Sequence, residues 1–156
     1  MFLSGKYKMV PIINSADINA GLDGDSINMA KAHRVVFLFM FGALGGASGA
    51  ILKVFSGATD AAKTSALTFK YALGSAATGS ATADILGDAA TSAALTLTAA
   101  TYQNKLLVVE VDGAEMDMAN NEEWLTVEIG AEADSGVLHV VAVVEPRYSD
   151  GTTVLA

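Results

Sequence analysis

Hydrophobic residues recur at every second position in several short stretches of the chain. In residues 66–73 leucine and aromatic residues alternate with small or polar ones, and residues 124–129 show the same pattern. A period of two places one set of side chains on one face of an extended strand. These stretches therefore predict half-buried β-strands. Further predicted strands are 6–13, 26–29, 50–56, 94–98 and 105–111, together with a buried strand at 34–44 and the most apolar strand of all at 137–145.

The longest uncharged stretch runs from Val35 to Leu52. Its length and its two overlapping GxxxG spacings are typical of a short transmembrane helix, and this reading stays open as an alternative. Its valines, phenylalanines and glycines, however, are poor helix formers. We therefore expect a buried strand at 34–44, a glycine-rich turn at 45–49 and a returning strand at 50–56.

Breaks between the strands are rich in small and polar residues. Residues 74–92 are mostly Ala, Gly, Ser and Thr, which predicts an extended loop with one helical turn. A turn at 102–104 separates two alternating stretches, so 94–98 and 105–111 are expected to form a hairpin.

About eight strands in 156 residues, with no amphipathic helix between them, predict an all-β fold. We expect a single-domain antiparallel β-sandwich or jelly-roll-like barrel. Pro11 makes the first segment an arm or an edge strand, since proline cannot donate to a β-ladder. The expected organisation is an extended N-terminal arm and turn-rich connection over 1–25, the sandwich over 26–148 and a tail over 149–156.

Charge excludes one class of partner. The net charge is -8, and it divides into +3 over residues 1–70 and -11 over residues 71–156. Nucleic-acid binding depends on lysine and arginine neutralising phosphates, so no nucleic-acid ligand is expected. A basic half next to an acidic half suits head-to-tail contacts or docking on an acidic partner, although solubility alone also explains it.

Candidate catalytic chemistry is sparse. The chain has no cysteine and two histidines, His33 and His139, which fall on separate predicted strands and are expected to be structural. No nucleophile elbow or phosphate-binding loop is present. The sequence therefore predicts no enzyme and no cofactor.

Two weaker readings concern acidic and aromatic residues. A cation or a pair of catalytic carboxylates is one interpretation of a set of acidic residues, but their spacing is not that of a calcium loop, and a solvated acidic rim is expected. These residues are Glu110, Asp112, Glu115, Asp117, Glu122 and Glu123. A sugar-binding platform of Tyr102, Trp124 and Tyr148 is a second interpretation, against packing in the core.

Three stretches, 66–71, 95–112 and 141–148, together with Lys6–Pro11 and Gly24–Met29, resemble a family of small virion proteins of tailed bacteriophages. The resemblance covers most of the chain and lies in strand and turn motifs. Proteins of that family accompany the major capsid protein, and the role that the resemblance implies is capsid decoration or cementing.

The resemblance implies a location on the capsid surface of the virion and a structural role. The expected partners are the major capsid protein and further copies of the chain, with a homotrimer as the expected assembly and no membrane. A tail or head–tail connector component, or a carbohydrate-binding module on the virion, remains the alternative. The residues expected to contact the capsid or another subunit are Lys6, Tyr7, Lys8, Met9, Val10 and Pro11.

Overall fold

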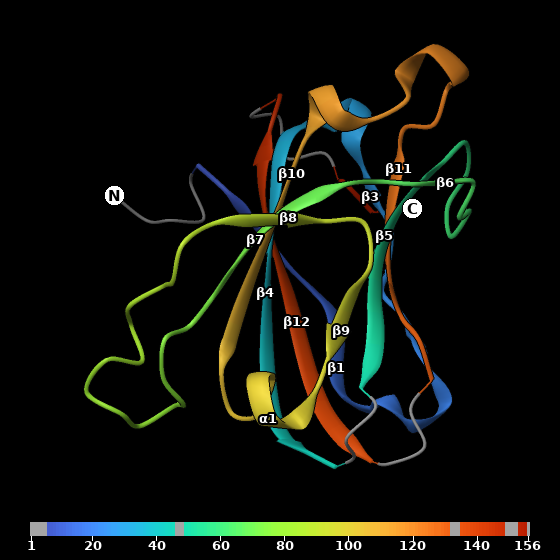
Figure 1. Cartoon of the computed structure of the whole chain (residues 1–156). Coiled ribbons are helices and arrows are strands. Elements are labelled where there is room, and N and C mark those ends of the chain that lie inside the picture. The colour runs from blue at the N-terminus through green and yellow to red at the C-terminus, as the bar shows by residue number, and fades with distance from the viewer. Residues whose placement is uncertain (1–5, 46–48, 132–134, 149–152, 156) are drawn as a thin grey trace.

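The computed structural model describes residues 6–45, 49–131, 135–148 and 153–155, and these form two antiparallel β-sheets around one hydrophobic core (Figure 1). In spatial order, the strands of the first sheet, sheet A, are β1 (Lys8–Asp17), β12 (Gly136–Pro146), β4 (Ala32–Leu44), β10 (Leu106–Asp112), β7 (Phe69–Leu73) and β8 (Ala90–Ser92). The predicted all-β, sandwich-like domain is confirmed.

The second sheet, sheet B, is built around β11 and β5. Its strands are β2 (Leu22–Asp23), β11 (Trp124–Ile129), β5 (Ala50–Gly57) and β6 (Ser65–Ala66), with β3 (Ile27–Asn28) paired to β11 and β9 (Leu95–Leu97) paired to β5. The helical elements among the described residues are single turns: η2 (Ile18–Ala20), η3 (Met29–Lys31), α1 (Ala99–Tyr102), η4 (Gly113–Glu115) and η5 (Met118–Asn120).

The inward side chains of β4 form the middle of the core. Val35, Phe37 and Phe39 are fully buried, and Phe41 is nearly so. Successive phenylalanine rings along the strand lie 6.4 Å apart, and Tyr102 meets Phe41 edge-on at 5.9 Å. Each ring removes a large apolar area from water, so this row of rings is a main source of the stability of the domain.

The predicted hairpin between 94–98 and 105–111 is wrong. β9 pairs with β5 in sheet B, whereas β10 pairs with β4 and β7 in sheet A. The single turn of α1 lies between them, and its buried Tyr102 packs against Phe41. Because α1 carries the chain from one sheet to the other, the two strands contribute to opposite layers instead of pairing.

Two other predicted stretches also cross between the sheets. Residues 66–73 divide into β6 in sheet B and β7 in sheet A. The predicted membrane stretch forms β4 in sheet A and β5 in sheet B, with residues 46–48 of its turn outside the described residues. The transmembrane helix is therefore wrong, and no helix within the described ranges is long and apolar enough to cross a bilayer.

The extended N-terminal arm is not confirmed. Residues 8–17 form β1, an edge strand of sheet A in register with β12, and Ile12 and Ile13 lie in the core. β2 belongs to sheet B, so the segment expected to stand outside the sandwich supplies strands to both of its layers. Of the predicted tail, residues 149–152 and 156 lie outside the described residues, but Val154 is buried and its carbonyl accepts the Asn28 N–H at 2.7 Å.

The predicted loop at 74–92 is confirmed over most of its length. It extends away from the two sheets (Figure 1), held at its base by a bridge between Gly74 and Leu86. Its last residues, 90–92, form β8 at the edge of sheet A.

Replacing Phe39 by alanine should destabilise the domain by about 3–5 kcal/mol, because the substitution leaves a cavity among the fully buried rings. The matched control is Phe55→Ala, since Phe55 lies on β5 with its side chain only part-buried. Urea unfolding followed by circular dichroism measures both. Equal losses in the two variants would contradict the assignment of the core.

Candidate functional site

Sheet A is apolar on both of its faces. The side chains of β4, β12 and β10 that alternate with the core residues point away from sheet B, and most of them are also hydrophobic. We call this surface the outer face. Its apolar residues are Met9, Pro11, Val36, Leu38, Met40, Ala72, Leu106, Val108, Val137, Val141 and Val143.

The register aligns these residues in rows across the strands. Leu38 of β4 lies opposite Val108 of β10 and Val141 of β12, and Pro11 of β1 lies opposite Val141. Directly opposed residues share one face of an antiparallel pair. The row therefore runs without a polar side chain from the edge strand β1 to β10, and Ala72 of β7 extends it beyond Val108.

An apolar outer face is unusual for an antiparallel sheet that meets water. Such sheets normally alternate apolar residues toward the core with polar residues toward solvent, while apolar residues on both faces are typical of a sheet that is covered on both sides. Met9, Met40 and Val137 are 52%, 43% and 43% exposed. A contiguous exposed apolar surface in a folded domain marks a site of interaction.

Charged residues bound the outer face at one end. The Arg34 guanidinium lies 3.3 Å from a Glu110 carboxylate oxygen and 3.4 Å from a Glu145 oxygen. The attraction and hydrogen bond of Glu110, followed by the attraction of Glu145, raise the pKa of Arg34 above its ordinary value. At this end of the outer face, the Arg34 guanidinium is therefore held between two carboxylates.

The six residues predicted to contact a partner do not form one surface. Lys6 and Tyr7 precede β1, with the Lys6 ammonium 5.4 Å from the centre of the Tyr7 ring. Met9 and Pro11 point onto the outer face, and Lys8 begins β1. Val10 is 8% exposed and belongs to the core, so its side chain contacts the interior of its own domain.

His139 has a structural role at a bulge in β1. The register between β1 and β12 shifts after Ile13, where Ser15 takes a positive φ of 49°. The Ser15 N–H donates a 3.2 Å hydrogen bond to Nδ1 of His139. A bulge disrupts the ladder, and here the imidazole accepts a bond that the ladder does not provide.

The six acidic residues are held in different places. Glu110 pairs with Arg34, Asp112 and Glu115 form the capping box of η4, and Asp117 accepts a bond from Asn120. Glu122, which is 5% exposed, accepts bonds from Ser56 at 2.5 Å and Ser65 at 3.1 Å, while Glu123 accepts from Asn28 at 3.4 Å. In the part of the chain that the structure describes, no group of three potential metal ligands converges.

The proposed aromatic platform is wrong. Tyr102 is buried against Phe41 beside the far end of β4, and burial raises the pKa of its hydroxyl. Trp124 begins β11 opposite Gly57 and Asn28. Tyr148 is exposed after β12, so the three rings do not share one face.

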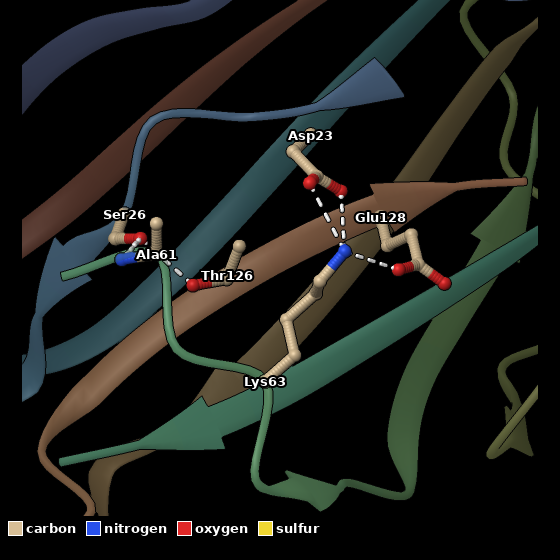
Figure 2. Close-up of polar contacts among 6 residues, drawn as sticks. All are labelled: Asp23, Ser26, Ala61, Lys63, Thr126 and Glu128. Carbon is tan, nitrogen blue, oxygen red and sulfur yellow. Dashed lines mark hydrogen bonds and ion pairs between the residues drawn. The ribbon is translucent and has the colours of Figure 1, made fainter. Parts of the chain in front are cut away.

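Sheet B carries a polar cluster that the sequence did not indicate (Figure 2). The Lys63 ammonium lies 3.0 Å from Asp23 and 2.5 Å from Glu128, and these hydrogen bonds raise the pKa of Lys63. The three side chains line a cavity of about 280 Å³. Nearby, the buried Ser26 and Thr126 hydroxyls lie 2.7 Å apart, and Ser26 accepts the Ala61 N–H, so the loop before Lys63 is fixed over β11.

Sequence reasoning did not single out the outer face, although a signal for it was present. Residues 35–41 and 137–144 are hydrophobic at both odd and even positions, with His139 as the one polar exception. We read this as the mark of strands buried in the sandwich. A run without alternation also describes a strand whose second face is covered only by another molecule.

No protein-family model, no curated protein and no solved structure matches the chain.

Replacing Lys63 by methionine should lower stability by about 1 kcal/mol near neutral pH, because Asp23 and Glu128 then face each other without a cation. The folded-state pKa of Lys63 is above its ordinary 10.5, so the stabilisation is complete below that pH and is lost as the pH rises through the raised value. Urea unfolding at several pH values measures the difference from the native chain.

Lys105→Met removes the same charge away from this cluster and serves as the control. A difference between the native and Lys63→Met chains that is absent at neutral pH, or that grows at alkaline pH, would contradict the role of Lys63.

Proposed function

We propose that this chain is a non-enzymatic structural protein that decorates the capsid of a tailed bacteriophage by binding the major capsid protein and further copies of itself. The observation that carries the proposal is the outer face of sheet A, a wide apolar surface on a well-packed scaffold. The resemblance to small tailed-phage virion proteins suggests the phage particle as the place where such a surface would bind its partners.

The physical basis of the proposed function is the burial of apolar area in many copies. Each Å² of apolar surface removed from water contributes about 25 cal/mol, so a contact over several rows of side chains is strongly favourable. Repetition of that contact over a lattice adds avidity, because neighbouring contacts hold each copy at a high effective concentration.

The N-terminal approach to β1 is the proposed capsid contact. Lys6 and Tyr7 lie before the edge strand, next to Met9 and Pro11 on the margin of the outer face. Lys6 and Lys8 place two positive charges at this end of an otherwise acidic chain, so this end favours an acidic partner. Val10 supports the strand from the core side.

The test is co-sedimentation of the purified chain with expanded capsids assembled from the major capsid protein of the same phage. We expect the native chain to bind and the double variant Lys6→Glu, Tyr7→Ala to bind at least about 10-fold more weakly, because a repulsive charge replaces an attractive one and an aromatic contact is lost. Cryo-electron microscopy of the pelleted particles locates the chain.

Lys105→Glu is the matched charge control. Lys105 lies beside Phe41, at the end of sheet A opposite to the start of β1, so the variant should bind like the native chain. Native chain that remains in the supernatant with both expanded and unexpanded capsids would contradict capsid decoration. Density at the tail or the portal vertex would instead identify a tail or connector component.

A further inference from the structure

We propose that a second copy of this chain covers the outer face of sheet A, so that two domains stack sheet against sheet about a two-fold axis. The inference deepens the proposed function, on which it rests, by naming the surface through which copies of the chain bind each other.

The first argument is the hydrophobicity of the central strand. Along β4, the three successive outward positions are Val36, Leu38 and Met40, and all three are hydrophobic. Its inner side packs against the core, so the outer side is the only remaining place for a second layer. Sheets that pack face to face lie about 10 Å apart with their side chains interdigitated, and aliphatic residues in regular rows suit that packing.

The second argument is area. The row through Leu38 is apolar across β1, β12, β4, β10 and β7. The rows on either side of it, through Val36 and Met40, are apolar at most positions and also hold Glu110, Lys70 and His139. With strands about 4.8 Å apart and same-face residues about 7 Å apart, three rows on five strands cover roughly 500 Å² in projection. The accessible area of protruding side chains and a polar margin add to this, which brings the face close to the roughly 800 Å² per partner of a stable interface.

The third argument is charge. The whole chain carries -8, yet the outer rows of β4, β7, β10 and β12 are close to neutral: two basic residues, Arg34 and Lys70, stand against three acidic ones, Glu110, Asp112 and Glu145. Arg34 lies between Glu110 and Glu145, and Lys70 lies opposite Glu110 in the register. A surface so close to neutral gains little from a strongly charged partner, and it lets two acidic chains approach each other with little net repulsion across the contact.

Symmetry then sets the stoichiometry. A face that binds an identical face forms an isologous contact, which is closed when two copies have met. The stack therefore predicts a dimer as the unit of self-association, in place of the trimer expected from the sequence. Lys6 and Tyr7 lie at the edge of this unit and remain available to the capsid.

The inference is tested by sedimentation velocity of the purified chain over a concentration series, without capsids. We expect a reversible monomer–dimer equilibrium. Leu38→Lys places a charge in the central row and should raise the dissociation constant at least about 10-fold, because the ammonium would have to be desolvated in the interface.

Met40→Lys is a second test of the outer face, and Ile51→Lys is its matched control. Met40 and Ile51 are 43% and 42% exposed, and both lie in long strands, but Met40 belongs to the outer face of sheet A and Ile51 to β5 of sheet B. Met40→Lys should weaken the dimer and Ile51→Lys should not. Val141→Thr keeps the β-branched shape next to Leu38 and should weaken the dimer while preserving the fold.

A native chain that is monomeric throughout the series, a trimer, or equal effects of Met40→Lys and Ile51→Lys would overturn the inference. Circular dichroism and urea unfolding show that each variant is folded. The two proposals can be refuted separately. A monomer that still sediments with capsids refutes only the stacked dimer. A dimer that binds neither expanded nor unexpanded capsids refutes only capsid decoration.

Discussion

The structure depends on the burial of β4 in the middle of sheet A. Its inward valine and phenylalanine side chains hold the two sheets together, and its hydrogen-bonded neighbours β12 and β10 are fixed by the same register that aligns their own inward residues. Because side chains alternate along a strand, every inward residue of β4 also fixes the position of an outward one. The packing of the core thereby aligns Val36, Leu38 and Met40 into a surface that faces water in the single chain.

Alternation was enough to predict the fold class and most strands, but not the pairing. Residues 94–98 and 105–111 both read correctly as strands, and their connection read as a hairpin turn. Nothing local in the sequence reveals that α1 takes the chain across the sandwich, because the choice depends on where Tyr102 finds its place against Phe41. The arm was misjudged for a related reason: Pro11 correctly indicated an edge position, but the burial of Val10, Ile12 and Ile13 depends on their packing in the core.

The candidate site was predictable in part. Met9 and Pro11 were singled out as contact residues and lie at the margin of the outer face, whereas Val10 alternates inward into the core. The larger portion of the face, on β4, β10 and β12, was hidden in stretches whose hydrophobicity was attributed wholly to the core. For the acidic residues, by contrast, the sequence suggested a site that the structure does not form. They cluster in sequence, but they have separate partners such as Arg34, Ser56 and the backbone of η4.

The claim that the outer face is buried in the working assembly is tested most directly by methionine oxidation footprinting of the chain, dilute and assembled. Met9 and Met40 lie on the outer face, and Met118 in η5 lies on another part of the domain; all three are exposed in the single chain, at 52%, 43% and 37%. The account predicts that assembly protects Met9 and Met40 from conversion to the sulfoxide while Met118 reacts as before. Unchanged oxidation of Met40 in the assembled protein would contradict it.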